Sequence, residues 1–495
     1  MSLERIIQDR LKKLANLKEA QIDPFPQIKF SQTPISQLLA DFEKIIKAGQ
    51  PAQAQGRILA LRGHGGLTFL DVVDQSARIQ LLAKEDELDQ DYENVVCNLD
   101  IGDFVQAEGE LFLTKTGEKT LKVKQIKLLV KSLRPLPEKR SGLKDIETRH
   151  RQPYLDLILN QSVRRVFIKR SEIVAAIRNF LISHNFLEVE TPILQPLAGG
   201  TNACPFKTHH QALGQDFFLR IAPELYLKRL IVAGFERVFE FAKNFRNEGL
   251  DPAHLQEFTM LEFYWAYADY EDLINLTEKM FTDFLSKVFA TTQIKYQSTL
   301  LDFKTPWPRL KFFDLVKAET GLNLDKLRTE KDLKEAIKDK GLKLDLKNKI
   351  GYGAVTDELY KKVIRPKLVQ PTVIMDYPKE MIPLAKTKTN EQNKIAVFQL
   401  IAGGWELVKA YNELNDPIEQ KQRFKEQEAL KNLGEKEAHS YDQEFVEALE
   451  YGLAPTAGWG MGIDRLCALL LDQPSVREVV FFPMVRKKTN AKVKK

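Results

Sequence analysis

Arginine, carboxylates and aromatic residues alternate along one stretch of the chain, from Val238 to Tyr267. The pattern predicts two strands joined by a short polar loop, each with one apolar and one polar face. An arginine can bind a phosphate, an aromatic ring can stack on a base, and carboxylates can hold an amine, so the polar face suits a pocket floor. A surface hairpin with solvated charges is the simpler interpretation of this stretch alone. The polar face would carry Glu240, Ala242, Asn244, Arg246, Glu248, Phe258, Met260, Glu262 and Tyr264, opposite Phe239, Phe241, Phe245, Leu261 and Phe263.

Glycine recurs at every second position later in the chain, at Gly458, Gly460 and Gly462, followed by Asp464 and Arg465. Glycines in a strand let it lie close to a ligand or to another backbone. Arg465 would then open a helix that is buried through its apolar positions. The element is a second candidate for binding chemistry.

Three glutamates lie in stretches that are not typical of a solvated surface. Glu224 follows a proline at the start of an amphipathic helix, and Glu406 and Glu413 share one strand-like run. An unpaired buried carboxylate costs several kcal/mol, so each is expected at a rim, in an ion pair or on a cation. Magnesium prefers one or two carboxylates together with phosphate oxygens, which suits Glu406.

Several common sites are missing from the sequence. It has no GxxxxGK[ST] loop, no GxGxxG between a strand and a helix, and no GxSxG or HExxH. The three cysteines are far apart without a CxxC pair, which argues against zinc and disulfides and suits a reducing cytosol. The charged start is no signal peptide, and no run approaches the roughly 20 apolar residues that cross a bilayer. We expect a soluble cytoplasmic protein without zinc.

Length and texture predict several domains, because 495 residues exceed what one core holds. A helical extension (1–50) precedes five strand-like runs (51–132) that suggest an OB-fold barrel, a common binder of single-stranded nucleic acid. The net charge of +6 permits such a polyanionic partner. A proline-rich basic linker (133–160) leads to a domain (161–486) without βαβ rhythm, hence with an antiparallel or mixed sheet. A solvated helical insertion is expected at about 321–350 and a basic disordered tail at 487–495.

The barrel contains candidates for stacking on bases and for hydrogen bonds to base edges. An ordinary strand residue is an equally good interpretation of any one of them. They are Arg57, Phe69, Arg78, Gln80 and Glu118.

Three stretches resemble the signature motifs of class II aminoacyl-tRNA synthetases: ETP at 190–192, FRNE at 245–248 and GWGMGIDR at 458–465. Further stretches, FLRIAPELYLKRL, EFTMLEFYWAYADY and ELNDP, resemble lysyl-tRNA synthetases over about residues 50 to 485. The resemblance implies an α+β fold, with an antiparallel sheet flanked by helices behind an OB-fold barrel. It also implies ATP-dependent charging of tRNA(Lys) with lysine through lysyl-adenylate, in a homodimer formed by the catalytic domain.

The resemblance also implies roles for single residues. Arg246 and Arg465 would be catalytic, holding the α-phosphate and the terminal phosphates of ATP, and Glu406 with Gln399 would hold Mg²⁺. The other ATP-binding positions are Glu248, His254 and Phe258; the lysine-binding positions are Gly200, Glu224, Glu262, Tyr264, Tyr411 and Glu413; the anticodon-binding positions are Phe69, Gln80 and Glu118, with Arg57 as a further candidate.

Elementary chemistry agrees with these roles. The carboxylate of the amino acid itself attacks phosphorus, so catalysis needs positioning and neutralised charge, not an enzymatic nucleophile. The lysine ammonium wants a carboxylate and an aromatic wall, which Glu413 with Tyr264 and Tyr411 would provide.

Three positions depart from the family pattern. Gln399 stands where a second metal-binding glutamate is usual, which leaves the number of magnesium ions open. Lys409 stands where an asparagine is usual near the bound lysine, and Cys204 stands where an arginine is usual.

Two alternatives follow from these departures. One is a related synthetase of the aspartyl or asparaginyl type, toward which only Lys409 points. The other is a non-catalytic tRNA-binding relative, which the presence of Arg246 and Arg465 disfavours.

Overall fold

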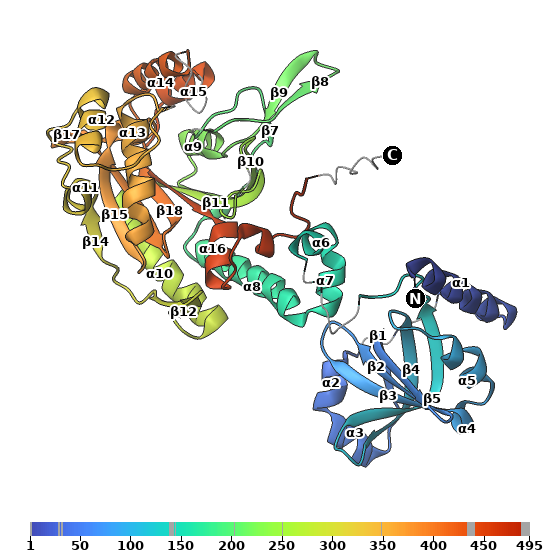
Figure 1. Ribbon diagram of the computed structural model, residues 1–495. Coiled ribbons are helices and arrows are strands. Elements are labelled where there is room, and N and C mark those ends of the chain that lie inside the picture. The colour runs from blue at the N-terminus through green and yellow to red at the C-terminus, as the bar shows by residue number, and fades with distance from the viewer. Residues whose placement is uncertain are drawn as a thin grey trace. The chain divides into compact units, whose positions relative to one another are not determined.

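The computed structural model describes residues 2–27, 30, 33–137, 143, 145–201, 203–249, 251–347, 349–432 and 441–486. The chain forms two compact units, residues 1–144 and 145–495 (Figure 1). The predicted basic tail at 487–495 lies outside the described residues. No helix in the described part of the chain is long and apolar enough to cross a membrane.

The first unit contains a closed five-stranded barrel in the order β1-β2-β3-β5-β4, with short helices between β3 and β4. This arrangement confirms the expected OB-fold. Alternate strand residues such as Ile58, Leu70, Leu81 and Leu121 are fully buried in its core. The elements are α1 (Leu3–Glu19), α2 (Ile35–Ala40), α3 (Phe42–Ala48), β1 (Ala52–His64), β2 (Leu67–Val73), β3 (Arg78–Lys84), α4 (Glu85–Leu88), α5 (Gln90–Asn94), β4 (Phe104–Leu113) and β5 (Lys119–Val130).

The amphipathic N-terminal helix α1 packs on this barrel. Leu17 is fully buried, and Arg10 donates hydrogen bonds to the carbonyls of Ile101 and Ser132, both at 2.9 Å. The arginine thus ties the helix to the loops before β4 and after β5.

The second unit is built around a nine-stranded sheet in the order β14-β15-β17-β18-β19-β11-β10-β6, with β16 paired to β17. All pairs are antiparallel except β14–β15 and β6–β10, as the lack of βαβ rhythm predicted. Its strands are β6 (Leu187–Glu188), β10 (Arg237–Phe245), β11 (Glu257–Ala266), β14 (Arg309–Lys311), β15 (Thr372–Pro378), β16 (Thr387–Lys388), β17 (Glu391–Ala402), β18 (Trp405–Asn412) and β19 (Thr456–Gly462).

Two smaller sheets and a set of helices complete this unit. In Figure 1 the β8–β9 hairpin extends away from the main sheet as an arm. The strands are β7 (Leu194–Gln195), β8 (Lys207–His210), β9 (Gln215–Leu219), β12 (Gln293–Tyr296) and β13 (Thr299–Asp302). The helices are α6 (Ile146–Arg151), α7 (Pro153–Leu159), α8 (Gln161–Ser183), α9 (Glu224–Val232), α10 (Tyr270–Phe289), α11 (Phe312–Thr320), α12 (Glu330–Asp339), α13 (Tyr352–Leu359), α14 (Pro417–Asn432), α15 (Gln443–Glu450) and α16 (Ile463–Leu470).

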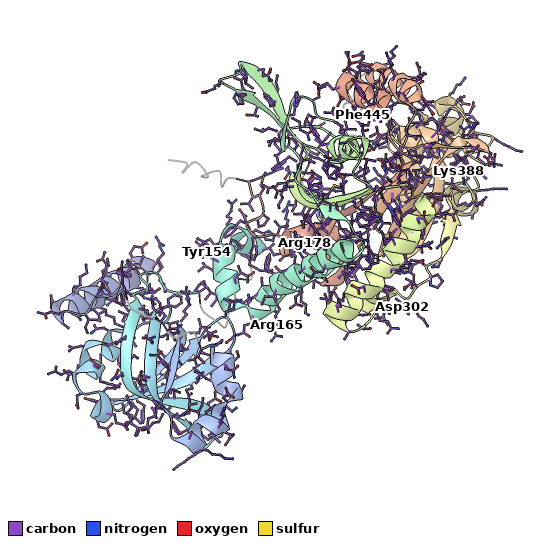
Figure 2. All side chains as sticks on the ribbon, turned by 180° about the vertical axis from the view of Figure 1, so that it is seen from behind. Tyr154, Arg165, Arg178, Asp302, Lys388 and Phe445 are labelled. Atoms are coloured by element: carbon purple, nitrogen blue, oxygen red, sulfur yellow. The ribbon has the colours of Figure 1, made fainter. Side chains whose placement is uncertain are left out.

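The two faces of the main sheet carry different cores. One face, with Phe239, Leu261, Phe263 and Trp459, packs against α8, α10 and α16. This is the apolar back predicted for the hairpin, which the structure confirms as β10 and β11. On the reverse view of Figure 2, Arg178 marks α8, where its guanidinium lies 4.5 Å from the centroid of the Phe241 ring. The other face is open to α9, α13 and the candidate site.

Two segments differ from their predicted character. The stretch expected to be a linker, 133–160, contains the helices α6 and α7. The expected insertion at 321–350 contains one helix, α12, and it is not wholly solvated. Leu333 and Ile337 are buried because the apolar stripe of α12 packs inward, and Leu322 and Leu324, which precede the helix, are buried in the same core.

Candidate active site

Rows of directly paired residues cross five strands of the main sheet and form the floor of the site. One row runs Gln399, Lys409, Gly460, Glu262 and Glu240. Paired residues of neighbouring strands point to the same face, so these polar side chains share the face opposite the α8–α10 core. The next row runs Val397, Tyr411, Gly458, Tyr264 and Val238.

A β-bulge in β18 turns Glu406 to this same face. Val408 pairs with Leu400, and Glu406 pairs with Ile401, so Leu407 is an extra residue in the strand. Without the extra residue, strict alternation would place Glu406 and Lys409 on opposite faces. The bulge therefore brings the carboxylate and the ammonium to one side of the sheet.

The glycines of β19 provide space at the centre of the floor. A Cβ atom on Gly458 would lie 2.0 Å from Oε1 of Glu413 and 2.6 Å from Cε1 of Tyr264. No other residue fits there while those side chains keep their places. The glycine at every second position of β19 was predicted to allow a close approach to the strand, and at Gly458 the side chains of Glu413 and Tyr264 make that approach.

A buried cluster of polar side chains, which we call the amine pocket, lies beside Gly458 and is formed by Glu224, Lys228, Glu262, Tyr264, Tyr411 and Glu413. Oε1 of Glu224 accepts hydrogen bonds from Nζ of Lys228 and from the hydroxyl of Tyr411, both at 2.7 Å. Lys228 also forms an ion pair with Oε2 of Glu413. Oε1 of Glu413 is buried and has no hydrogen-bond partner among the described residues. A carboxylate oxygen left in this state is suited to an incoming ammonium.

Glu262 forms a second wall of the amine pocket. The hydroxyl of Tyr264 lies 3.4 Å from its Oε2, and the side chain is 5% exposed. Burial, together with the nearby carboxylate of Glu224, raises the pKa of Glu262 to about 8. Burial also raises the pKa of Glu413 well above its usual range, although Lys228 opposes this. A bound cation would lower the pKa of both carboxyl groups and stabilise their ionised forms, so the pocket favours positively charged ligands.

Sequence reasoning missed Lys228. Its ammonium is fully buried, 5.8 Å from the ring centroids of Tyr411 and of Phe445, which Figure 2 labels on α15. Glu224 and Lys228 stand four residues apart on α9, a spacing that ordinarily predicts an exposed helix pair. Leu225 and Ile231, three residues before and after Lys228 on the same helix face, were the available signal that this face is buried.

Arg246 and Phe258 lie together at the open end of the hairpin. The Arg246 guanidinium is 5.0 Å from the centroid of the Phe258 ring, and both its Nε and its Nη2 are 3.4 Å from the carbonyl of Ile221. Burial lowers the pKa of Arg246, and Glu248 partly opposes this. The long contacts leave guanidinium hydrogens for an anion beside an aromatic face.

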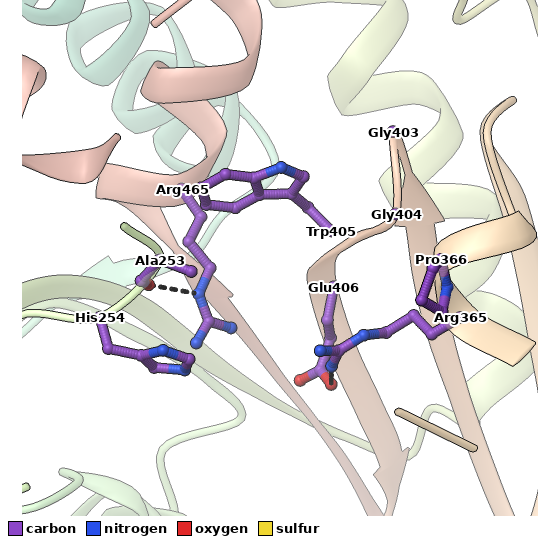
Figure 3. A pocket seen from close by; sticks show the side chains of 9 residues that line it. All are labelled: Ala253, His254, Arg365, Pro366, Gly403, Gly404, Trp405, Glu406 and Arg465. Atoms are coloured by element: carbon purple, nitrogen blue, oxygen red, sulfur yellow. Dashed lines mark hydrogen bonds and ion pairs between the residues drawn. The ribbon is translucent and has the colours of Figure 1, made fainter. Parts of the chain in front are cut away.

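A cavity of about 320 Å³ lies next to this pair, and we call it the phosphate cavity. Figure 3 shows Arg465 and Arg365 entering it from opposite sides, with Glu406 between them and His254 below Arg465. Nε of Arg465 donates to the carbonyl of Ala253 at 3.3 Å, and Nη1 of Arg365 is 3.8 Å from Oε2 of Glu406. The cavity is lined by Ala253, His254, Arg365, Pro366, Gly403, Gly404, Trp405, Glu406 and Arg465.

The helix that carries Arg465 is held by its neighbour Asp464. Oδ1 of Asp464 pairs with Nη2 of Arg170 at 2.6 Å, and Oδ2 accepts the backbone N–H of Thr259 at 2.9 Å. These two contacts join α16 to α8 and β11, so Arg465 is presented from a fixed base.

Of the two predicted magnesium ligands, Glu406 and Gln399, only Glu406 has a side chain suited to bind the ion. Although burial alone would raise it, Lys409, Arg465, Arg365 and Lys361 hold the pKa of Glu406 below its usual value, so Glu406 is ionised at neutral pH. The predicted second ligand, Gln399, uses its Oε1 to accept a hydrogen bond from Tyr377 at 2.8 Å. Throughout the described residues, no group of three His, Cys, Asp or Glu side chains is placed to hold a metal.

The other predicted site residues lie around these two pockets. Gly200 has a φ of +93°, and a Cβ there would be 3.1 Å from Cβ of Glu224, so its loop packs against the amine pocket. The carbonyl of Cys204 accepts the N–H of Asn247 at 2.7 Å, next to Arg246. Glu248 is exposed in the loop after β10, and His254, in the same loop, bonds to Asp251 at 2.8 Å.

In the barrel, Phe69, Gln80 and Glu118 lie on the face opposite Leu70 and Leu81. Phe69 and Asp71 are two residues apart on β2 and therefore point to the same face, and Asp71 is paired with Gln80 on β3. Arg78 forms ion pairs with Asp71, at 3.0 Å, and with Glu118. Thr120 bridges the Gln80 side chain and the Glu118 carbonyl at 3.0 and 3.2 Å. Arg57 lies apart from this strip, 4.2 Å from the centroid of the Phe104 ring.

Comparison with known proteins identifies the family. Residues 145–486 match the family model of class II tRNA synthetases (D, K and N), and residues 53–129 match that of the OB-fold nucleic acid binding domain. The lysine–tRNA ligase of Pelotomaculum thermopropionicum is 43% identical over 98% of this chain and 95% of its own length. The chain belongs to the lysine–tRNA ligases of class II. Those of Clostridium novyi and Roseiflexus castenholzii are each 45% identical, over 97% and 98% of this chain and 94% and 99% of their own lengths.

The charges of the amine pocket are compatible with a lysine–tRNA ligase. The amine pocket carries three carboxylates and one internal ammonium, so it does not suit the aspartate or asparagine side chain of the alternative reading. Lys409 was the residue that pointed to that alternative, and it lies in the same row as Gln399 and Glu262. Burial lowers the pKa of Lys409, and among the charged neighbours Glu406 opposes this most.

Proposed function

We propose that this chain joins lysine to tRNA in two steps, activation by ATP to lysyl-adenylate and transfer to the 3′ end of tRNA(Lys). The observation that carries the proposal is the buried amine pocket beside the cluster of Arg246, Arg465 and Glu406. An amine-binding pocket next to a phosphate-binding one is what the first step requires.

Lysine is held by charges at both of its amines. The unpartnered Oε1 of Glu413, close to Tyr264, accepts the side-chain ammonium, and Glu224 and Glu262 face the α-ammonium. A substrate without the side-chain ammonium would leave Glu413 buried and unpaired, which is how the pocket rejects shorter or neutral amino acids.

Activation is a displacement at the α-phosphorus of ATP. An oxygen of the lysine carboxylate bonds to phosphorus, and the bond to the bridging oxygen breaks, so pyrophosphate leaves with both electrons of that bond. No side chain has to take a proton, because the attacking carboxylate is already ionised. Arg246 neutralises the charge at the α-phosphate while Phe258 stacks on adenine, and Arg465 neutralises the departing pyrophosphate. Glu248 and His254 complete the ATP site.

Magnesium enters with ATP, and Glu406 is the side chain that would hold it. The ion, when bound, supplies neutralisation of phosphate charge. The protein contributes an ionised carboxylate fixed by the β18 bulge, at the edge of the cavity that Arg465 faces.

The barrel recognises the anticodon of tRNA. Phe69 offers a ring for stacking, and Gln80 and Glu118 offer groups for base edges on the same strip. Arg57 has a supporting role at most, since its guanidinium donates to the carbonyl of Gly102 at 3.2 Å and stacks on Phe104.

The catalytic unit forms a homodimer in the cytoplasm, where tRNA is charged for translation. Exposed apolar side chains near α8 and the end of the described chain support this. Phe167 stacks on Phe481 at 3.9 Å, and Phe482 and Met484 next to this pair are 66% and 51% exposed. Sedimentation of Phe482→Glu is expected to show more monomer than the unchanged protein.

Charging of tRNA with labelled lysine tests the two-step function. The unchanged protein is expected to form lysyl-tRNA, and Arg246→Ala is expected to lose this activity by about 10²-fold or more while keeping its melting temperature. Unaltered activity of a folded Arg246→Ala protein would overturn the assignment of the phosphate site.

A further inference from the structure

The carboxylate of Glu406 lies among four basic side chains of the same chain. Arg365 approaches within 3.8 Å of it, and Arg465 faces the same cavity from the opposite side (Figure 3). Lys361 stands one turn before Arg365 in the π-helical turn Tyr360–Ile364, and the bulge brings Lys409 to the same face as Glu406. Among the described residues, Glu406 is thus the one acidic residue in the lining of the phosphate cavity, which it shares with Arg365 and Arg465, while Lys361 and Lys409 are outside that lining.

The electrostatics agree with this arrangement. Each of the four basic groups lowers the pKa of Glu406. Burial lowers the pKa of Lys409, while Glu406, Asp357 and Glu224 oppose that shift. Nε of Arg365 is buried without a hydrogen-bond partner among the described residues, so this guanidinium retains an unused donor. Lys361 also forms an ion pair with Asp357 at 2.6 Å. Lys409, Arg365 and Arg465 still carry more positive charge than Glu406 neutralises, so the cluster favours a polyanion such as triphosphate.

A second protein-held divalent ion does not suit this part of the cavity. Gln399, the nearest candidate ligand on β17, is neutral, and its oxygen already accepts the Tyr377 hydroxyl. Its direct partner on the neighbouring strand is Lys409, whose side chain is on the same face. A metal at Gln399 would therefore meet a cation where it needs an anion.

We propose that Arg365, Lys361 and Lys409 neutralise the pyrophosphate end of ATP in place of a second metal ion, so that one divalent ion, at Glu406, suffices. The inference rests on the proposed activation of lysine by ATP. The three side chains are fixed charges that the fold supplies before substrate binds, which makes activation less dependent on free magnesium.

Counting bound metal tests the inference directly. Mn²⁺ is titrated into the full chain saturated with lysine and α,β-methylene-ATP, and free Mn²⁺ is followed by electron paramagnetic resonance. About one tightly bound Mn²⁺ per chain is expected. The double variant Gln399→Glu, Lys409→Asn is expected to bind an additional ion, because it exchanges a neutral and a positive neighbour for a carboxylate and an amide. Two or more tightly bound ions in the unchanged protein would overturn the proposal.

A kinetic variant isolates the role of Arg365. Arg365→Gln is expected to raise the KM for ATP and the magnesium concentration needed for half-maximal exchange, each by at least about fivefold, with the KM for lysine unchanged. Lys362→Gln, at an exposed neighbouring position, is the matched control. An unchanged magnesium requirement in Arg365→Gln would contradict the inference. Lysine-dependent pyrophosphate exchange by the unchanged protein tests the proposed function separately, so the two failures are distinguishable.

Discussion

Lys228 and Glu413 form an ion pair in which neither side chain has any exposed surface. The same ammonium is 2.7 Å from Oε1 of Glu224, so one internal cation joins two carboxylates of the amine pocket. Oε1 of Glu413 has no hydrogen-bond partner among the described residues and is left for a ligand. Lys228 thereby sets the charge of the pocket: three carboxylates and one ammonium leave room for the two ammonium groups of lysine.

Replacing Lys228 tests this arrangement. Lys228→Met keeps most of the volume but removes the charge that opposes the raised pKa of Glu413. The carboxyl group of Glu413 would therefore hold its proton more strongly and would lose its attraction for the substrate ammonium. We expect the KM for lysine to rise by about tenfold or more, with a smaller change in kcat and an unchanged KM for ATP. Arg229→Gln, next to it on α9 but outside the pocket, serves as the control. An equal loss in both variants would show that the effect comes from the helix and not from the pocket.

Lysine binding should improve with pH between about 6 and 8, because burial holds the pKa of Glu262 at about 8 in the free protein. The folded protein then keeps a proton that the unfolded chain releases near its ordinary value of 4.5. Stability from this group is therefore full below that value and declines as pH rises toward 8. Calorimetry in buffers of different ionisation enthalpy should detect proton release when lysine binds. Binding without proton release near pH 7 would contradict the raised pKa.

Gly458→Ala should close the amine pocket without unfolding the protein. The added carbon would meet Glu413 at 2.0 Å, so the carboxylate has to move or lysine has to leave. We expect the KM for lysine to rise by about 10²-fold, while ATP binding persists. In Gly462→Ala, four residues along the same strand, the nearest contact would be an ordinary 3.6 Å to Arg465. That control should keep its affinity for lysine, and comparable losses in both variants would refute the close approach at Gly458.

Phe69→Ala should separate tRNA recognition from lysine activation. Loss of a stacking ring costs about 1–3 kcal/mol per base, so we expect weaker charging of tRNA and unchanged pyrophosphate exchange. Arg57→Ala should have a smaller effect on charging, since its guanidinium is engaged with Gly102 and Phe104. If Phe69→Ala damaged exchange as much as charging, the barrel would have a different role.

The sequence predicted elements more successfully than contacts. The faces of the β10–β11 hairpin followed from alternation, and the glycine spacing of β19 indicated a close approach before any partner was known. The orientation of Glu406 toward the site was not predictable from strand alternation. The β-bulge at Leu407 that causes it can be recognised only when the pairing of β18 with β17 is known. Lys228 and Arg365 were missed for a similar reason: basic residues on helices and turns are normally solvated, and tertiary packing decides otherwise.

The most direct test of the account is ATP–pyrophosphate exchange with lysine, aspartate and asparagine offered separately. The three carboxylates of the amine pocket predict exchange with lysine and none above background with the other two. Exchange stimulated by aspartate or asparagine, with none for lysine, would contradict the assignment of Glu413 and Glu262 to a substrate ammonium.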